Sequence, residues 1–314
     1  MSRVNESLRI YYYFVFGAIG GLTGWFFSSL LLLSTASTLE LAIYGAILGA
    51  MIGLAIAAYE GFATKSLLRL FKFGSSGLML GAVAGLFALP TSQWLYSRLV
   101  HTVSDRSSAT LGWKSTGAGM VCWILFGGLI GFVESLNKGT QSIKGFSGGV
   151  LGGIVGGGIY ELARGYGMAQ TASLKQQIVL AISLSILGGA IGASIALVTV
   201  ALKRAWIEVM DGKFAGRVYD VTKYVDPQLG SRKPGIIGSD EWRSNIYLPG
   251  DHKVQATHAK IGYANGAAFL SVFPGAQKRA NTLVNGSSVT HWVLNDGDRL
   301  QIGRTLLVYK QKRR

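Results

Sequence analysis

Residues 39–59 read LELAIYGAILGAMIGLAIAAY, an apolar run whose only charged residue is Glu40. An α-helix needs about 20 such residues to cross the hydrocarbon core of a bilayer. Five further runs resemble it in length and polarity: 10–33, 77–96, 117–136, 146–162 and 177–202. Soluble core helices of this length carry charge along one face. The sequence therefore predicts an all-α membrane bundle of about six transmembrane helices.

Composition divides the chain into two parts. It has 314 residues, of which 49% are hydrophobic and only 14% charged, with a formal net charge of +15. Charged residues make up about a quarter of an ordinary soluble domain, and here they become frequent only near the end of the last apolar run. We therefore expect a transmembrane domain in residues 1–204 and a soluble domain in residues 205–314.

Glycines recur at steps of three or four residues along the apolar runs, as in Gly45, Gly49 and Gly53. Such a glycine zipper lies on one helix face and lets two helices approach closely in lipid. We interpret these faces as packing contacts within one subunit. The alternatives are contacts of a homo-oligomer or of a pore.

An internal repeat is visible in the apolar half. Residues 53–60 (GLAIAAYE) resemble residues 127–134 (GGLIGFVE), and a weaker copy without the glutamate begins at Gly189. We predict three helical hairpins in tandem. Glu60 and Glu134 occupy matching positions near helix ends and beside basic loops, which favours interfacial carboxylates. The alternative is an ion or proton site, since ionisable groups in transmembrane segments mark transport paths.

Lysine and arginine indicate the topology. They are more frequent before the first apolar run, after the sixth, and in the second and fourth loops than in the other three loops. The positive-inside rule then predicts both termini in the cytoplasm. The single cysteine, Cys122, cannot form an intrachain disulfide, so nothing indicates an oxidising compartment. We interpret the first apolar run as a retained helix rather than a signal peptide, and we expect a bacterial inner membrane.

Short alternating segments replace the long apolar runs after residue 204. They are 205–210, 217–221, 235–237, 245–248, 259–263, 267–273, 282–284, 288–294, 299–302 and 305–309. Turn dipeptides such as Asn265-Gly and Asn285-Gly separate them. This pattern is typical of an all-β sandwich.

Several motifs carry a family resemblance in this half. They are Ile237-Gly-Ser, Val254-x-x-x-His-Ala, and Asp296-Gly-Asp followed by Ile302-Gly. Together they resemble a forkhead-associated (FHA) domain over residues 205–310. The resemblance implies an eleven-stranded β-sandwich whose apical loops bind phosphothreonine peptides, and it implies a binding module rather than an enzyme.

The resemblance also implies site residues. Partner-binding residues would be Ser239, Arg243, Gln255, Lys278, Arg279, Asn281 and Thr282, with structural roles for Gly238 and for His258, which would brace the loops. The chain departs from the family where phosphate would bind: Ser239 replaces the usual arginine and Gln255 the usual serine. Phosphate recognition needs strong donors, and Arg243, Lys253, Lys278 and Arg279 could supply them or could form a solvated basic surface. The sequence leaves open whether the domain binds a phosphorylated or an unphosphorylated partner.

Other chemistry is not indicated by the sequence. It has no P-loop, nucleophile elbow or metal-ligand spacing, so we expect no enzymatic activity, cofactor or metal. The positive charge is explained by topology and by membrane lipid rather than by nucleic acid. The predicted function is a membrane-anchored signalling adaptor that binds a protein partner, such as a Ser/Thr-phosphorylated protein. The alternatives are a transporter or channel with a regulatory FHA-like domain, and a structural subunit of an oligomer.

Overall fold

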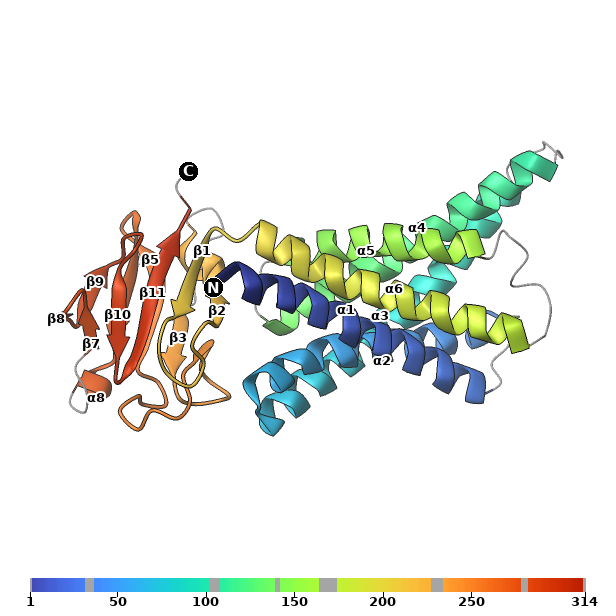
Figure 1. Cartoon of the computed structure of the whole chain (residues 1–314). Helices are drawn as coiled ribbons and strands as arrows, with labels where there is room; N and C mark the ends of the chain where they lie inside the picture. Colours follow the sequence, from blue (N-terminus) through green and yellow to red (C-terminus); the bar gives the residue numbers. More distant parts are fainter. Residues whose placement is uncertain are drawn as a thin grey trace. The chain divides into compact units, whose positions relative to one another are not determined.

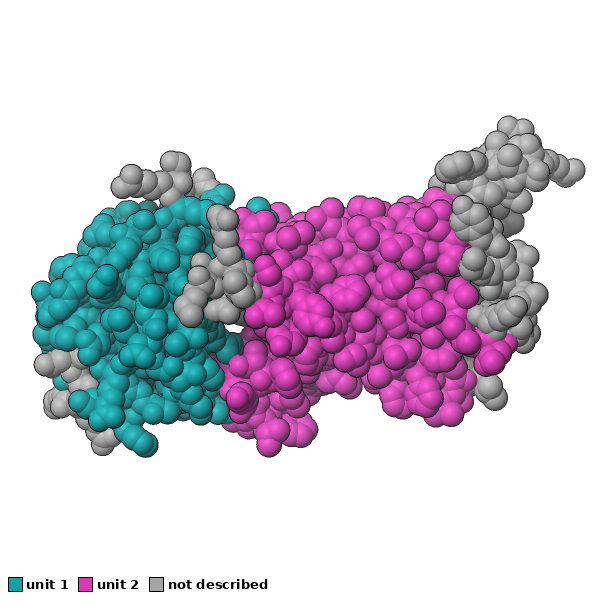
Figure 2. Space-filling model, in the orientation of Figure 1, with its two compact units in different colours: residues 1–6, 202–314 teal, residues 7–201 magenta. Residues whose placement is uncertain are grey.

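The protein consists of long helices followed by a β-sandwich, as Figure 1 shows and as the sequence predicted. The computed structural model describes residues 2–31, 37–101, 108–138, 142–163, 174–226, 234–277 and 282–312. The chain divides into two compact units, which are coloured separately in Figure 2: residues 7–201, and residues 1–6 with 202–314.

Six long helices overlap the six predicted apolar runs. They are α1 (Ser2–Leu30), α2 (Thr38–Thr64), α3 (Leu67–His101), α4 (Ser108–Lys138), α5 (Ser142–Ala163) and α6 (Leu174–Ala201). Within the described part of the chain, α1, α2, α3, α4 and α6 are long and apolar enough to cross a membrane. Helix α5 falls short of that measure and is rich in glycine.

The helical unit, residues 7–201, exposes large apolar side chains. Phe87 is 61% exposed, Val155 55% and Ile182 54%. Soluble monomers rarely expose apolar surface of this extent, whereas lipid tails solvate it without cost. These exposed faces are consistent with an integral membrane protein.

Glycines let neighbouring helices touch main chain to main chain. A Cβ added to Gly49 of α2 would collide with the carbonyl oxygen of Gly81 in α3. A Cβ added to Gly131 of α4 would likewise collide with the carbonyl oxygen of Gly145 in α5. The zipper faces predicted from the sequence therefore form the contacts within the α2–α3 and α4–α5 hairpins.

A third glycine-paired contact, between α6 and α1, joins the two ends of the helical unit. Gly188 of α6 lies against Gly17 of α1, and Gly192 lies against Tyr13. Helix α6 is followed by a strand rather than by another helix, so α1 covers its glycine face. The three predicted hairpins are therefore two hairpins, α2–α3 and α4–α5, and one pair of helices from opposite ends of the unit. The three pairs close into a ring, because α1 also packs on α2, α3 on α4, and α5 on α6.

Apolar side chains from α2, α4 and α6 fill the interior of the helical unit. They belong to one buried cluster and are each at most 1% exposed: Leu48, Ile52, Ile56, Phe126, Ile130, Leu184, Leu187 and Ile191. Contacts between α2 and α4, and between α4 and α6, bring these residues together.

The β-sandwich has two sheets. The six-stranded sheet has the order β2 (Val218–Asp220), β1 (Ala205–Val209), β11 (Thr305–Gln311), β10 (Arg299–Ile302), β7 (Thr282–Val284) and β8 (Ser287–Ser288). The five-stranded sheet has the order β4 (Ile246–Tyr247), β3 (Gly235–Gly238), β5 (Ala259–Ala264), β6 (Ala267–Val272) and β9 (His291–Val293). Short helices α7 (Thr222–Val225) and α8 (Pro274–Gln277) interrupt the strands. Ile207, Leu270, Leu300 and Tyr309 belong to the fully buried core between the sheets.

One predicted strand, 288–294, is two strands in the structure. Strand β8 pairs with β7 in one sheet, and β9 pairs with β6 in the other. Between them, the N–H of Val289 donates to Thr282 (3.0 Å), and the carbonyl of Thr290 accepts from Val272 (2.8 Å). The chain crosses from one sheet to the other at these two residues.

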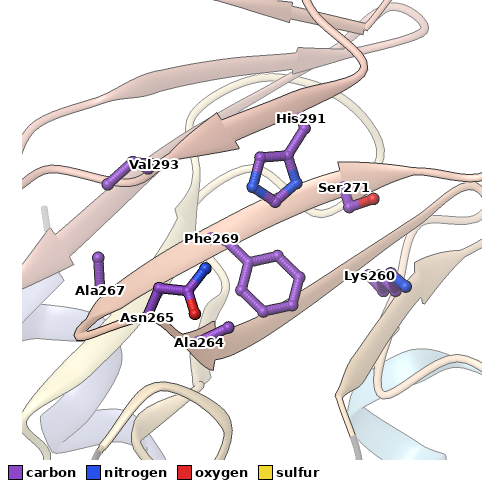
Figure 3. Close-up of a pocket in the computed structure, with 8 residues that line it drawn as sticks. All are labelled: Lys260, Ala264, Asn265, Ala267, Phe269, Ser271, His291 and Val293. Atoms are coloured by element: carbon purple, nitrogen blue, oxygen red, sulfur yellow. The ribbon is translucent and has the colours of Figure 1, made fainter.

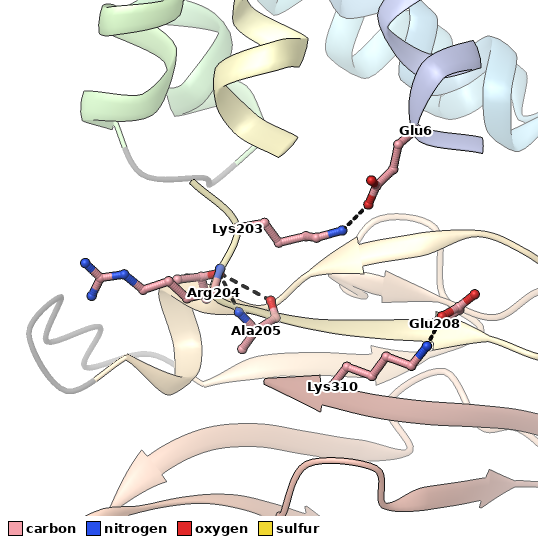
Figure 4. A network of polar contacts seen from close by, with 7 residues as sticks. Glu6, Lys203, Arg204, Ala205, Glu208 and Lys310 are labelled. Atoms are coloured by element: carbon pink, nitrogen blue, oxygen red, sulfur yellow. Dashed lines mark hydrogen bonds and ion pairs between the residues drawn. The ribbon is translucent and has the colours of Figure 1, made fainter. Parts of the chain in front are cut away.

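Polar contacts fix the start of the sandwich (Figure 4). Lys203 forms an ion pair with Glu6 at the beginning of α1. The N–H groups of Arg204 and Ala205 both donate to the hydroxyl of Thr222, at 3.0 and 3.1 Å. These bonds satisfy main-chain groups where the last helix gives way to β1.

Two alanine substitutions in α5 test the glycine contacts. Gly149→Ala places a methyl group against the carbonyl oxygen of Gly127, whereas the nearest neighbour of an alanine at Gly158 is Met120, at 3.9 Å. We expect Gly149→Ala to lower the unfolding free energy by about 1–3 kcal/mol, as overpacking does. Gly158→Ala should be neutral or slightly stabilising, because alanine favours helix. Thermal unfolding in detergent, followed by circular dichroism, measures both, and equal losses would contradict main-chain contact at Gly149.

Candidate partner-binding site at the apical loops

The first two loops at the apical end of the sandwich are joined by hydrogen bonds. They are the β3–β4 loop and the β4–β5 loop. The N–H of Ser239 donates to the carbonyl of Gln255 (2.9 Å), and its hydroxyl donates to the carbonyl of Val254 (3.0 Å). A Cβ at Gly238 would collide with the carbonyl oxygen of Ala256. Only glycine therefore allows the two loops to meet.

The third apical loop, between β6 and β7, is tied to the other two by Gln255. Its side-chain amide donates to the carbonyl of Gly275 in α8 (2.8 Å). The polar groups of Ser239 and Gln255 thus bond within the loops. A phosphate needs strong or charged donors that point outward, and these two side chains do not supply them in this arrangement.

His258 braces the loops from inside the sandwich, where it is fully buried. Its Nδ1 accepts from the N–H of Gln255 (3.2 Å), so Nε2 carries the proton and donates to the hydroxyl of Thr282 (3.0 Å). Burial lowers the pKa of His258 below its usual value, although the charge of Asp251 acts in the opposite direction. The imidazole is therefore neutral and structural. Thr282 is itself 2% exposed and lies in the interior beside it.

A rigid turn in the β3–β4 loop presents two exposed side chains. The carboxylate of Asp240 accepts from the N–H groups of Trp242 (2.7 Å) and Arg243 (2.9 Å). Glu241 accepts from the hydroxyl of Tyr247 (2.7 Å) and anchors the other side of the turn. Trp242 is 55% exposed, and the exposed side chain of Arg243 forms no hydrogen bond or ion pair with another residue that the structure describes. The sequence analysis did not select Trp242. The residue that could have indicated it is Asp240, because aspartate often forms such a turn with the N–H groups that follow it.

Asp251 links the β4–β5 loop to the turn between β10 and β11. Its carboxylate accepts from the N–H groups of Arg304 (2.5 Å) and Lys253 (3.0 Å). Partial burial alone would raise the pKa of Asp251, but these donors and the hydroxyl of Thr305 lower it below its usual value. The ionised carboxylate holds this side of the site in place.

The structure brings six of the predicted site residues to the apical end. They are Gly238, Ser239, Arg243, Gln255, His258 and Thr282. Lys278, Arg279 and Asn281 lie outside the described residues. No group of three histidine, cysteine, aspartate or glutamate residues in the described part of the chain could hold a metal ion.

The two glutamates of the membrane repeat come close together. Glu60 of α2 forms an ion pair with Arg69 of α3 (3.8 Å). Glu134 of α4 is 4% exposed, and the charges of Glu60 and of Arg9 in α1 act on it. Four helices thus contribute two acidic and two basic residues to one mixed-charge group.

Comparison with known proteins identifies the sandwich. A family model described as the FHA domain matches residues 235–303. The fold and the apical loops agree with this match, and the chain therefore carries an FHA domain at its C-terminal end. No family model matches the helical region. No curated protein matches the chain in sequence.

Solved structures that resemble the chain include FHA domains. One comes from a study of phosphothreonine-dependent FHA domain interactions; it is 23% identical with a TM-score of 0.28, over 35% of this chain and 99% of the other. The FHA domain of a Chlamydia trachomatis protein is 20% identical with a TM-score of 0.29, over 35% and 99%. Mycobacterium tuberculosis EmbR, in complex with a low-affinity phosphopeptide, is 14% identical with a TM-score of 0.27, over 84% and 71%.

Buried neutral His258 predicts a pH dependence of stability. In the unfolded chain a histidine has a pKa of about 6.5, and burial lowers it in the fold. The unfolded state therefore binds the proton more tightly, so stability is complete above about pH 6.5 and falls as the pH decreases. We expect His258→Gln to abolish this dependence and to cost about 1–3 kcal/mol at neutral pH.

Hydrogen exchange of β5 and β7 in the detergent-solubilised chain, between pH 5 and 8, measures this stability after correction for intrinsic exchange. His252→Gln changes an exposed histidine of the same domain and serves as the control. An unchanged pH dependence in His258→Gln would mean that another group is responsible.

Proposed function

We propose that this chain, whose residues 235–303 are an FHA domain, is a membrane-anchored adaptor that binds a protein partner through its apical loops. The observation that carries the proposal is the rigid turn displaying Trp242 and Arg243. Tryptophan and arginine are among the residue types most enriched at the positions that dominate binding energy in protein interfaces. A preorganised turn also lowers the entropy cost of ordering them on binding.

We further propose that binding does not depend on phosphate. The hydroxyl of Ser239 and the amide of Gln255 bond within the loops. In the described part of the β3–β4 and β4–β5 loops, Arg243 and Lys253 are the exposed arginine and lysine. They make a weaker phosphate site than a cluster of charged donors in fixed geometry. An exposed tryptophan beside Arg243 favours recognition of an unmodified protein surface.

Charge and hydropathy support the membrane setting that we propose. In the part of the chain that the structure describes, five helices are long and apolar enough to span a membrane. The distribution of lysine and arginine supports cytoplasmic termini, and with them a cytoplasmic FHA domain. The membrane that we propose is a bacterial inner membrane. The helical unit then serves as an anchor in contact with lipid. We propose neither catalytic activity nor nucleic-acid binding for this chain.

Peptide titration of the full chain in lipid nanodiscs tests the apical site. Matched phosphothreonine and unphosphorylated peptide libraries are compared by fluorescence anisotropy. We expect selected peptides to bind equally well with and without phosphate. Trp242→Ala and Arg243→Ala should each weaken binding by about 30-fold, which corresponds to about 2 kcal/mol.

Arg299→Ala is the matched control, because Arg299 is an exposed arginine on the outer face of β10, away from the apical loops. Binding that requires phosphate would show that the loops rebuild a phosphate site. Absence of binding to either library would remove the apical loops as the partner site.

A second candidate function, transport, is favoured by the mixed-charge group of Arg9, Glu60, Arg69 and Glu134. Buried ionisable residues in membrane helices often mark ion pathways. The apolar cluster in the interior of the unit is an argument against an open path in this conformation.

Removing both carboxylates separates the two functions. We expect Glu60→Gln with Glu134→Gln to leave peptide binding by the nanodisc-embedded chain unchanged, because adaptor function needs only an intact anchor. Proton or ion flux in proteoliposomes measures the alternative. Flux in the native chain that the double substitution abolishes would establish a transporter.

A further inference from the structure

A recess lies on the outer face of the five-stranded sheet, apart from the apical loops (Figure 3). Its volume is about 270 Å³. It is lined by residues of β5, β6, β9 and the turn between β5 and β6: Lys260, Ala264, Asn265, Ala267, Phe269, Ser271, His291 and Val293. We call it the sheet-face recess.

The floor of the sheet-face recess is apolar. The ring of Phe269 covers Gly262 in the neighbouring strand, where an added Cβ would lie 2.9 Å from it. The ring of His291 stacks on Phe269, with 5.4 Å between the ring centres and 26° between the planes. Val293 beside them is 51% exposed. This apolar surface faces outward, on the side of the sheet that does not contact the core.

The rim of the recess is polar, and its polar groups are not hydrogen-bonded within the described part of the chain. Lys260, Ser271 and His291 stand in one row across β5, β6 and β9, and Asn265 closes the end at the turn. None of these four side chains forms a hydrogen bond or ion pair with another described residue. An apolar floor with a few convergent polar groups is the usual composition of a binding site. In contrast, the side chains of Ser239 and Gln255 form hydrogen bonds within the apical loops.

The recess borders an open sheet edge, because β9 is the last strand of its sheet in the described part of the chain. The main-chain bonds of Thr290 and Leu294 run to β6. Hydrogen-bonding direction alternates along an antiparallel strand, so the N–H and C=O groups of His291 and Val293 point to the other side. An extended peptide can add to such an edge and place alternate side chains on one face.

We propose that the sheet-face recess and the edge of β9 form a second docking surface for an extended acidic segment of a partner protein. The segment pairs with β9, packs an apolar side chain on Phe269 and places a carboxylate at Lys260. Charge complementarity supports this occupant, because Lys260 is the formal charge of the lining, which contains no carboxylate. The surface acts in addition to the apical loops and does not depend on them.

Defined peptides test the docking surface on the full chain in phosphatidylcholine nanodiscs. The probe is a labelled peptide that alternates glutamate with valine or isoleucine. Two control peptides replace glutamate by lysine or the apolar residues by serine. We expect the probe to bind saturably and the two control peptides not to bind. The docking surface recognises both the negative charge and the apolar side chains of the probe.

Two substitutions locate the binding. Lys260→Glu should weaken it by about tenfold, since it turns attraction into repulsion. Ser271→Trp should abolish it by filling the recess. The control Arg299→Glu makes the same charge change on the outer face of the other sheet, and Trp242→Ala removes the apical tryptophan. Neither control should alter probe binding. The experiment thus tests the sheet-face recess separately from the proposed partner site at the apical loops.

Several results would overturn the proposal. They are no saturable binding of the probe, equal losses in Lys260→Glu and Arg299→Glu, and loss only in Trp242→Ala. Retention by anionic phosphatidylserine vesicles that Lys260→Glu abolishes, without peptide binding, would assign this face to lipid instead. Circular dichroism confirms that each variant keeps its sheet structure, and Val293→Ser provides a second test of the apolar contact should Ser271→Trp not fold.

Discussion

Main-chain contact that only glycine permits underlies both halves of this protein. In the helical unit, Gly49 rests on Gly81, and the other two helix pairs are built in the same way. Lipid supplies no hydrophobic drive for helices to associate, so their attraction depends on this closeness. In the sandwich, Gly238 lies beneath the carbonyl of Ala256 and lets two apical loops exchange hydrogen bonds. A single Cβ would separate the partners in either place.

The sequence predicted the helices and most strands because their signals are local. Apolar length and glycine spacing locate α1 to α6, and alternation with Asn-Gly turns locates the strands, where Asn265 and Asn285 adopt the positive φ that such turns need. The division of 288–294 was not predictable, because alternation continues through Val289 and does not say which sheet each half joins. The pairing of α6 with α1 joins opposite ends of the helical unit, and no local pattern encodes it.

Site residues were harder to predict than strands. Motif resemblance pointed to Gly238 and His258, and the structure shows the contacts that give each a bracing position. The motif resemblance could not show that the hydroxyl of Ser239 turns inward, because that orientation depends on the carbonyl of Val254 in another loop. Trp242 escaped notice because a lone tryptophan in a polar loop has no periodicity. Polar groups at the sheet-face recess come from three strands and one turn, so only the folded sheet assembles them.

The two proposed surfaces of the FHA domain differ in whether their polar groups form hydrogen bonds within the domain. At the apical end, hydrogen bonds are made internally, which fixes the loops while Trp242 and Arg243 stay exposed at the surface. At the recess, the sheet alone fixes the strands, so Lys260 and its neighbours are left for a partner. Two modest contacts on one rigid sandwich reinforce each other, because the second forms at the high effective concentration set by the first. Such an adaptor holds its partner at the membrane without a strong phosphate site, provided that the partner spans both surfaces.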